Sequence, residues 1–456
     1  ITVKAGDTEG TNKVSQGTNK DVVDTDTIIT GTSNENTVTI DTSKGNVDVT
    51  FDDLNIDASS RNKAAMSVTG SGNTTIKLDG DNHLTGGNGS NGIDSNGSLT
   101  IYGGENDSLT AKGGSGADGS GGDGIHSGSL TIYGGTVNAA GGDGTNSSDG
   151  GSGIRISSRS LTIYDGTVNA KGGNGGNVSG DGILSDGGVT ISGGTVKAAG
   201  GDSKDGYGGD GIRSGGVVTI SGNTVNAAGG NGGKVGGYGI CSFDRVAISG
   251  GTVEAAGGNG STGGGSGIYS SVIDLSGSLE LTAKAGSPNG KALSRAGSEL
   301  DLDDIKDKLD PGAKVTTTDA DGNVIQQVSI PRPVEPEKPV IPEESSSSSD
   351  GGSATPSAPA SPLPDLTVTD KDGQRISYTS TQSGNTLTVC VGRLTASLRA
   401  SLATLRQLRA EGIDTITFQT ILCSTTLSVD ELLAMGGEDA EAVLTHRLTA
   451  SSLTVG

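Results

Sequence analysis

The sequence predicts an all-β protein: a right-handed parallel β-helix followed by a small α+β domain. Three observations support this prediction. The chain has 456 residues with 82 glycines, no tryptophan and only 3 phenylalanines, so it lacks the large side chains of a wide globular core. Its middle part repeats with a period of about 28 residues. Within each period, aliphatic and polar residues alternate, which is the pattern of half-buried strands.

The repeat is anchored on the dipeptide Gly-Ile. Its isoleucine occurs at seven positions that are 28 to 32 residues apart: Ile93, Ile125, Ile154, Ile183, Ile212, Ile240 and Ile268. Segments such as SLTIY or VVTIS follow the anchors, and segments such as TVNAAGG come next. We therefore expect three short strands per coil and about nine coils, with each aliphatic residue lying on its equivalent in the next coil. The paired glycines are expected to form turns with positive φ.

The segments that flank the repeats have other expected roles. Residues 1–50 follow the period poorly and should form the N-terminal cap and the first coils, before the regular repeats of 51–297. Residues 298–330 should cap the other end, with a helix over 298–309 that begins at Ser298 and a hairpin that turns at Asp321-Gly322. Residues 331–364 contain nine of the eleven prolines and the run SSSSS, which predicts a linker.

Residues 365–456 have a different composition and predict the small α+β domain. NTLTVCV (385–391) predicts a strand, and 394–412 predicts an amphipathic helix with its leucines inward and Gly412 at its C-terminal end. The segments 414–418, 425–429, 430–436 and 442–446 continue the α+β pattern. Cys390 and Cys423 either pair as a disulfide or remain buried thiols.

Charge, hydropathy and histidine content limit the classes of function. The net charge of −22 argues against binding to nucleic acid phosphates and suits an extracellular or cell-surface protein. No apolar run approaches the length of a membrane span, so no span is expected. The three histidines lie far apart in the sequence, so no nucleophilic triad can be assembled and catalysis is not expected. A monomer is the expected state.

One outward column of the coils is aromatic. Tyr102, Tyr133 and Tyr164 end three successive SLTIY segments, so they should stack on one face of the β-helix. An exposed strip of tyrosines can bind sugar rings, which present apolar C–H faces to aromatic rings. The other interpretation is that tyrosine favours outward strand positions for its own reasons, or that loops cover the strip. Both interpretations stay open.

Two columns contain carboxylates. In the GGxG turn, Asp143 and Asp202 lie among asparagines, so this column predicts either an Asx ladder bonded to the turn backbone or ligands of Ca²⁺. Before the Gly-Ile anchor, a second column contains Asp123, Asp181 and Asp210. Stacked carboxylates repel each other unless a cation or water lies between them, which makes Asp181 and Asp210 a candidate Ca²⁺ pair.

A stretch at 47–93 carries a resemblance to a known family. Its elements are Leu54-Asn55-Ile56, Ala64-Ala65, the segment from Ile76 to Gly80, and Asn82-His83-Leu84, and GSLTIYGGTVNAAGG fits the coils downstream. They resemble bacterial carbohydrate-binding domain proteins, typified by clostridial cellulose- and pectin-binding β-helices, over about residues 26–290. The resemblance implies a secreted β-helix with calcium in some loops and affinity for plant cell-wall polysaccharide. The C-terminal domain resembles segments of secreted proteins from gut Clostridia, which implies a Gram-positive gut bacterium.

These features predict a secreted or cell-surface, non-catalytic protein that binds plant-type polysaccharide through the tyrosine strip, with Ca²⁺ as a candidate cofactor at the aspartates. The alternative is an adhesin-like structural rod with no glycan ligand. A polysaccharide lyase is a weaker third interpretation, because Arg155 and Arg213 follow the anchor but no tight carboxylate cluster accompanies them.

Overall fold

The structure is a computed structural model that describes residues 1–117, 119–145, 147–332, 366–369, 375–376, 378–391, 395–420, 424–435, 440–447 and 450–455. The chain divides into two compact units, Ile1–Pro333 and Val334–Gly456. Almost all of the predicted linker at 331–364 lies outside the described residues. Within the described residues, no helix has the length and apolar character needed to cross a membrane.

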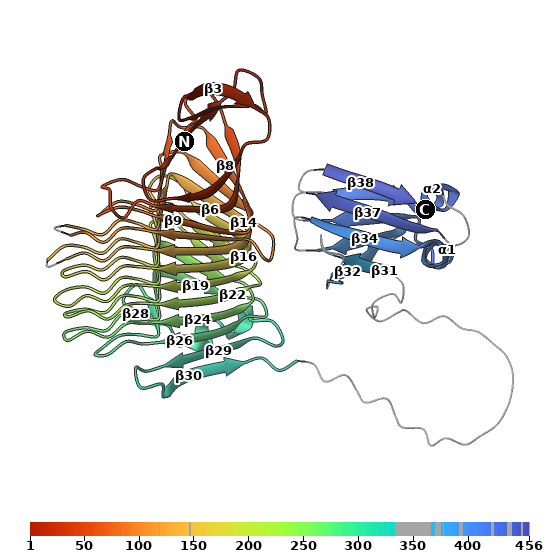
Figure 1. Cartoon of the computed structure of the whole chain (residues 1–456). Helices are drawn as coiled ribbons and strands as arrows, with labels where there is room; N and C mark the ends of the chain where they lie inside the picture. Colours follow the sequence, from red (N-terminus) through yellow and green to blue (C-terminus); the bar gives the residue numbers. More distant parts are fainter. Residues whose placement is uncertain are drawn as a thin grey trace, which may run out of the picture. The chain divides into compact units, whose positions relative to one another are not determined.

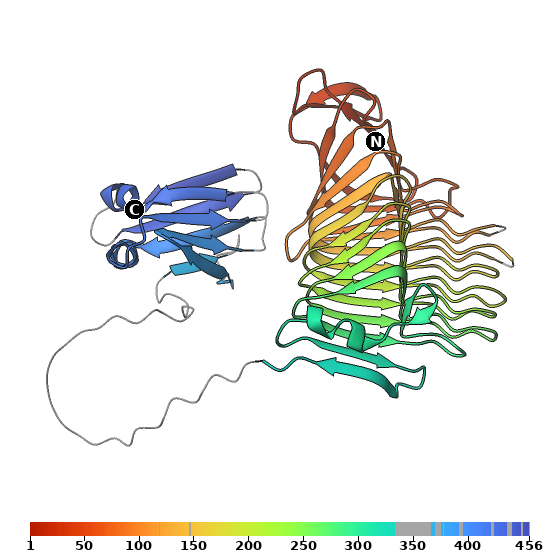
Figure 2. The same cartoon turned by 180° about the vertical axis from the view of Figure 1, so that it is seen from behind.

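The first unit is a parallel β-helix, as predicted (Figures 1 and 2). Its coils stack into three columns of parallel strands, which we name A, B and C in chain order within a coil. Column A consists of β1 (Thr2–Ala5), β5 (Val38–Asp41), β7 (Met66–Thr69), β10 (Ile93–Ser95), β13 (Ile125–Ser127), β15 (Ile154–Ile156), β17 (Ile183–Ser185), β20 (Ile212–Ser214), β23 (Ile240–Ile248), β25 (Ile268–Leu275) and β27 (Leu293–Arg295).

Columns B and C share several long strands that turn a corner. Column B consists of the first parts of β4 (Ile28–Ser33), β6 (Val47–Asp57), β14 (Ser129–Ala140) and β16 (Leu161–Lys171), the second parts of β23 and β25, and β8 (Asn73–Asp79), β11 (Ser98–Tyr102), β18 (Val189–Ile191) and β21 (Val218–Ile220). Column C consists of the second parts of β4, β6, β14 and β16, with β9 (Asp81–Thr85), β12 (Ser108–Lys112), β19 (Thr195–Ala199), β22 (Thr224–Ala228), β24 (Thr252–Ala256), β26 (Glu280–Lys284) and β29 (Lys314–Thr318).

The number of coils is slightly higher than predicted. Column A has eleven strands, whereas the sequence suggested about nine coils. The additional coils lie at the ends, where β1, β5, β7 and β27 do not begin with the Gly-Ile anchor. Within the regular part the predicted register is confirmed: Ile154 pairs with Ile183, and Ile183 pairs with Ile212.

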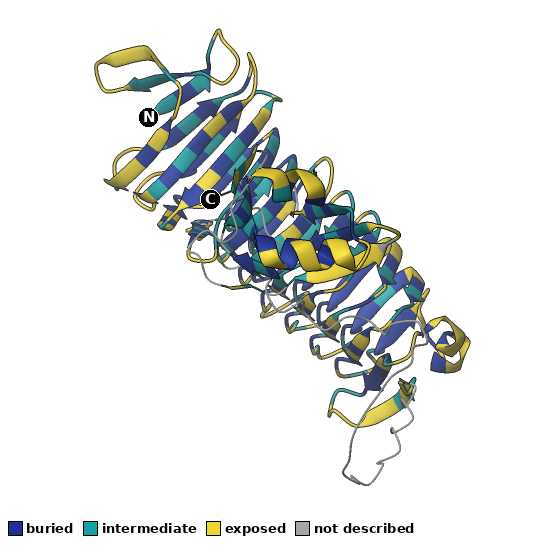
Figure 3. Cartoon of the chain, turned by 90° about the vertical axis from the view of Figure 1, so that its right-hand side faces the viewer, coloured by how far each residue is buried: buried dark blue, intermediate teal, exposed yellow. Residues whose placement is uncertain are grey.

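Aliphatic ladders fill the narrow interior. The anchor isoleucines are fully buried, as are the inward valines and isoleucines of columns B and C. Outward residues of the same strands are half-buried or exposed, so burial alternates along each strand (Figure 3). Each aliphatic side chain therefore packs on its equivalent one coil away, which explains why the sequence repeats the same residue type at each inward position.

Both ends of the β-helix are capped by antiparallel strands. At the N-terminal end, β2 (Asn12–Gln16) and β3 (Asn19–Asp24) form a hairpin beside β1. At the other end, β30 (Val324–Ser329) pairs antiparallel with β29, and the turn contains Gly322 with φ of +89°, which confirms the predicted hairpin.

The helix predicted over 298–309 is wrong. Ser298–Glu299 form the short strand β28, and the rest forms two 3₁₀ turns, η1 (Leu302–Asp304) and η2 (Lys306–Lys308). Because strand pairing uses the first residues, the remaining segment is too short to favour an α-helix. The apolar positions assigned to the helix are nevertheless buried against the last coil: Leu300, Leu302, Ile305 and Leu309.

The paired glycines serve two purposes, of which the sequence predicted one. Glycines in the turn between columns B and C have the predicted positive φ, for example Gly194 with +74°, whereas those in the loops between columns C and A do not, except for Gly89 with +61°. These loops project from one side of the β-helix in a parallel row (left in Figure 1). Both the two legs of one loop and the loops of neighbouring coils run so close together that no side chain fits. A Cβ atom on Gly172 would lie 1.9 Å from the carbonyl oxygen of Gly180 in the other leg of its loop, and one on Gly180 would lie 1.7 Å from the carbonyl oxygen of Gly151 in the preceding coil.

A continuous series of hydrogen bonds joins these glycines. The Gly180 N–H donates to the carbonyl of Gly173 within the same loop, and the Gly201 N–H donates to the carbonyl of Gly180 from the next coil, both at 2.9 Å. The alternation continues over thirteen residues, which we call the glycine ladder: Gly286, Gly265, Gly258, Gly237, Gly230, Gly209, Gly201, Gly180, Gly173, Gly151, Gly142, Gly122 and Gly114. Each N–H donates to the carbonyl of the next residue named, so the loops are bonded to one another along the axis.

The second unit contains two four-stranded sheets that share one apolar core. The first is antiparallel, with the order β31 (Leu366–Thr369), β34 (Thr395–Ser401), β37 (Glu441–Arg447) and β38 (Ala450–Val455). The second has the order β32 (Thr379–Ser383), β33 (Thr386–Cys390), β35 (Thr415–Gln419) and β36 (Ser424–Ser428). Cys390 is a free thiol, and Cys423 lies outside the described residues.

The helix predicted over 394–412 is wrong in its first half. Thr395–Ser401 form β34, and only α1 (Leu402–Ala410) is helical. The Ser401 hydroxyl caps α1 by accepting a hydrogen bond from the Thr404 N–H at 3.1 Å. Buried and outward residues alternate before this cap, so pairing with β31 and β37 overrides the helix propensity of the segment.

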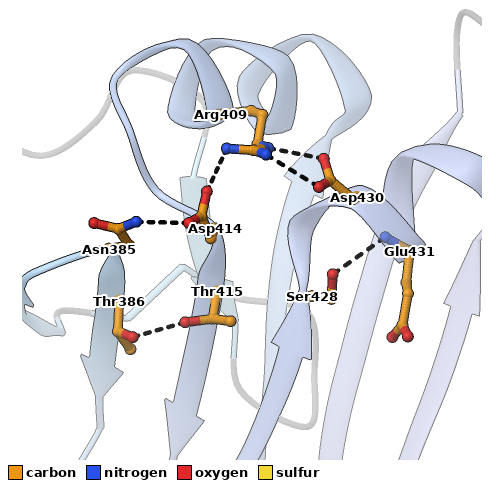
Figure 4. Close-up of polar contacts among 8 residues, drawn as sticks. All are labelled: Asn385, Thr386, Arg409, Asp414, Thr415, Ser428, Asp430 and Glu431. Atoms are coloured by element: carbon orange, nitrogen blue, oxygen red, sulfur yellow. Dashed lines mark hydrogen bonds and ion pairs between the residues drawn. The ribbon is translucent and has the colours of Figure 1, made fainter.

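Arg409 joins the end of α1 to the second helix, α2 (Val429–Met435) (Figure 4). Its Nε donates to Asp430 Oδ1 at 2.8 Å, its Nη2 donates to Asp430 Oδ2 at 3.2 Å, and its Nη1 donates to Asp414. Asn385 Nδ2 donates to the other oxygen of Asp414 at 2.6 Å. These bonds hold the two helices and the ends of two strands of the second sheet together.

Candidate functional site

Tyr102, Tyr133 and Tyr164 stack on the outward face of column B, at the positions that the sequence predicted. The ring centroids of Tyr102 and Tyr133 are 4.8 Å apart with 4° between the planes, and those of Tyr133 and Tyr164 are 4.8 Å apart with 8°. The spacing follows from the pairing of the coils, because equivalent outward side chains repeat at the distance between neighbouring strands. We call these three rings the tyrosine stack.

Stacking limits which part of each ring a ligand can reach. Both faces of Tyr133 are covered by its neighbours, so this residue presents only its edge and hydroxyl. The face of Tyr102 that is turned toward the N-terminal end has no aromatic neighbour and is turned toward Lys77, which lies in register one coil earlier; the opposite face of Tyr164 also has no stacked ring. Aromatic faces carry the negative part of the π-quadrupole and are the surfaces that apolar C–H groups contact. The stack therefore offers a place for a sugar ring at each end rather than a continuous platform.

A cavity of about 790 Å³ lies at the Tyr102 end of the stack. Segments of the N-terminal cap, residues 5–12, 25–27 and 44–46, form its walls. Outward side chains of β6, β8 and β11 form its floor, where Thr50, Lys77 and Tyr102 lie in register on successive coils. A volume of this size falls within the range of small-ligand pockets.

The lining of the cavity is rich in hydrogen-bonding groups. Asp48, Thr75 and Thr100 lie in register beside the tyrosine column, and further carboxylates and ammonium groups come from the walls. Burial, then Tyr133 and then Asp48 raise the pKa of Tyr102, so its phenol remains a neutral donor at physiological pH. Hydroxyl, carboxylate and ammonium groups around one aromatic ring complement a ligand with many hydroxyls.

The sequence did not predict this cavity. Its walls belong to the first 50 residues, which follow the period poorly, so their position over column B could not be read from a repeat. The available signal is that Lys77 and Asp48 occupy outward positions one and two coils before the first SLTIY segment, where the next coil has Tyr102 and Thr75, respectively.

Asp143 and Asp202 belong to an exposed ladder of turn residues. Asp143 Oδ1 accepts the N–H of Asn174 at 2.7 Å, and Asp202 Oδ1 accepts the N–H of Asn231 at 2.6 Å. The asparagines of the column make the same bond, as Asn231 does with the N–H of Asn259 at 2.9 Å. The structure thus contains the Asx ladder, with bonds that join neighbouring coils instead of closing each turn on itself.

Asp123, Asp181 and Asp210 form the second carboxylate column, and they too bond to the next coil. Their Oδ1 atoms accept the N–H groups of Ser152 at 2.7 Å, Asp210 at 2.6 Å and Tyr238 at 2.7 Å, respectively. Burial raises the pKa of Asp123. Burial also raises the pKa of Asp181 to about 6, and burial together with the neighbouring Asp181 raises the pKa of Asp210 to about 8.

The two carboxylate columns remain separate, so the five aspartates do not converge on one site. In the part of the chain that the structure describes, no group of three or more His, Cys, Asp or Glu side chains is arranged to hold a metal ion. Among the five aspartates, Asp181 and Asp210 interact electrostatically: both are buried, they lie on successive coils, and the charge of one disfavours ionisation of the other.

A second aromatic group surrounds Arg213, which the sequence had considered only as a lyase residue. Its Nη1 lies 3.9 Å from Asp210 Oδ2, and its guanidinium carbon lies 5.3 Å from the centroid of the Phe243 ring. Tyr238 and Tyr269 stack nearby, with centroids 5.0 Å apart. Sequence reasoning missed this group, because only Arg213 and Tyr269 share an outward column, whereas Tyr238 and Phe243 come from other positions of the coil.

Comparison with models of protein families, with curated proteins and with solved structures finds no match for this chain. The evidence for a function therefore lies in the geometry of the tyrosine stack and its cavity.

Proposed function

We propose that the protein is a non-catalytic carbohydrate-binding protein and that the cavity at Tyr102 holds a sugar. The observation that carries this proposal is the position of Tyr102: it ends the tyrosine stack and lines a polar cavity of about 790 Å³. An aromatic ring face bordered by hydroxyls and carboxylates is the combination that a sugar needs, because one side of a sugar ring is apolar and its rim is polar.

Each residue of the cavity floor would make a different contact with the sugar. Tyr102 would stack against the apolar side of the sugar, and Thr75 and Thr100 would bond its hydroxyls through donors and acceptors alike. Asp48 would accept hydrogen bonds from ligand hydroxyls, and Lys77 would donate to them. Plant cell-wall polysaccharide is the proposed source of the ligand, which places the protein outside the cell or on its surface.

Replacing Tyr102 with alanine is expected to weaken glycan binding about tenfold, because an aromatic contact contributes on the order of 1 kcal/mol beyond the area it buries. Calorimetric titration of the full chain with cello-, xylo- and galacturono-oligosaccharides measures the effect. Tyr269→Ala is the matched control, since Tyr269 is a half-buried member of a stacked pair on another column. Its removal should leave binding unchanged.

Titrations with Ca²⁺ and with chelator test the role of the metal. Binding of galacturono-oligosaccharides only in the presence of Ca²⁺ would assign the metal a bridging role. The double substitution Asp181→Asn with Asp210→Asn should then weaken this binding. If Tyr102→Ala binds as well as the natural chain, the cavity is not the site. Absence of binding to every glycan in both buffers would favour the adhesin-like rod.

A further inference from the structure

The C-terminal end of the tyrosine stack differs from the end that borders the cavity. Column B continues past Tyr164 in register, with Ile163 beside Ile191 and Ile191 beside Ile220. The residues that follow these isoleucines are Ser192 and Ser221, so serines occupy the tyrosine position in the next coils. A glycine follows each of these serines, so the surface drops from a tall column of rings to small residues.

The drop forms a step whose wall is the ring of Tyr164. This side chain is the most accessible of the stack, and Tyr164 as a whole is 40% exposed. The floor consists of Ser192, which is exposed, and of the outward threonines Thr190 and Thr219, which are half-buried and lie in register. A ligand that rests on this floor would meet the free face of the ring from the side.

The floor carries no charge, although the chain has a net charge of −22. The outward side chains of β18 and β21 and the serines after them are all hydroxyls: Thr190, Thr219, Ser192 and Ser221. Hydroxyls donate and accept hydrogen bonds, whereas an acidic ligand would need a cation that this floor does not offer. The arrangement therefore suits a neutral ligand with an apolar face and a hydroxylated rim.

We propose that the free face of Tyr164 and the hydroxyl floor beyond it form a second sugar site, specific for a neutral glycan. The inference rests on the proposed function for the class of ligand, but on different residues for the site. Tyr164 and Ser192 are exposed at this step, whereas segments of the N-terminal cap form walls around the cavity at Tyr102. The step accepts internal residues of a long chain, whereas the cavity accepts short ligands or chain ends.

The test uses the full chain, a soluble neutral polysaccharide such as a mixed-linkage glucan, and a short oligosaccharide of the same sugar. Ser192→Leu covers the face of Tyr164 with an aliphatic side chain, and Tyr164→Ala removes the ring. Both variants should weaken binding of the polysaccharide about tenfold and leave binding of the oligosaccharide unchanged. Tyr164→Phe keeps the ring face and should bind like the natural chain. Tyr102→Ala should show the opposite selectivity.

The outcomes separate this inference from the proposed function. If Ser192→Leu and Tyr164→Ala leave polysaccharide binding unchanged while Tyr102→Ala weakens binding of the oligosaccharide, the second site is overturned and the cavity stands. If Ser192→Leu and Tyr164→Ala weaken the polysaccharide and Tyr102→Ala changes nothing, the step is the sugar site and the cavity is not. If no variant changes binding, or nothing binds, both are overturned. Circular dichroism of each variant should match that of the natural chain, because Tyr164 and Ser192 are exposed.

Discussion

Replacing Gly180 with alanine is expected to destabilise the β-helix by at least about 3 kcal/mol, or to prevent its folding. The added Cβ would lie 1.7 Å from the carbonyl oxygen of Gly151 and 2.4 Å from its carbonyl carbon. Both atoms belong to backbone that the glycine ladder holds from two sides, since Gly151 donates to Gly142 and accepts from Gly173, and Gly180 itself donates to Gly173 and accepts from Gly201. Neither leg of the loop can move without breaking bonds to the next coil. Urea unfolding followed by circular dichroism measures the loss.

Gly263 provides the control for this substitution. It lies in an equivalent loop, has no positive φ, and a Cβ there would meet only the side chain of Val235, at 3.8 Å. Gly263→Ala should therefore change the free energy of unfolding by no more than about 0.5 kcal/mol. Equal stability of Gly180→Ala and the natural chain would mean that the loops are not packed as tightly as the glycine ladder requires.

The second large effect concerns the buried carboxyl groups of Asp181 and Asp210. Their ordinary pKa is 3.8, and in the folded chain burial raises these pKa values to about 6 and about 8. Below pH 3.8 both groups are protonated in the folded and the unfolded chain, and this contribution to stability is fully present. As the pH rises toward 8, the unfolded chain releases both protons more readily, so the contribution is lost.

The double substitution Asp181→Asn with Asp210→Asn should remove this loss. The amide oxygen can still accept the N–H of the next coil, as Asn91 does in the same column when it accepts the Asp123 N–H at 2.7 Å. We expect the variant to be more stable than the natural chain by about 1–3 kcal/mol at pH 8 and no more stable at pH 4. Thermal unfolding between pH 4 and pH 8 measures both values.

Asp202→Asn is the control for the pH effect. Asp202 makes the same bond to the next coil, but it is exposed, so its replacement should leave the pH dependence unchanged. A double variant at Asp181 and Asp210 that is less stable than the natural chain at pH 8 would contradict the prediction. That result would mean that the two carboxylates are ionised and held by a cation, and addition of Ca²⁺ should then stabilise only the natural chain.

The parts of the fold that repeat could be predicted from the sequence, and the parts that do not repeat could not. The inward isoleucines reveal their register because each packs on its own equivalent, so the period of the sequence is the period of the structure. The same reasoning placed the tyrosine stack. It could not place the N-terminal cap over column B, and so it missed the cavity, because no periodicity relates the cap to the coils.

Two local errors have a common physical origin. Residues 298–309 and 394–412 both show helical spacing of apolar residues, yet their first parts form strands. In each case a neighbouring strand offers an edge for pairing, β27 to β28 and both β31 and β37 to β34. This pairing satisfies backbone groups that a short helix would leave open at its end. The glycines of the loops between columns C and A were misinterpreted for another reason. A glycine in the sequence shows that the position has no side chain, but it does not distinguish a turn with positive φ from a close approach of two backbone segments.

The glycine ladder and the three columns also bear on how such a chain can change its length. Each regular coil presents to the next the same inward residues, the same loop glycines and the same acceptors on its edge. Loss of one whole unit, such as residues 183–211, would join Gly182 to Ile212 and still place equivalent inward residues and loop glycines in contact. Duplication of a unit would add one coil with the same contacts. Unequal exchange between repeats in a gene can therefore change the number of regular coils while the N-terminal cap, the cavity and the tyrosine stack stay the same.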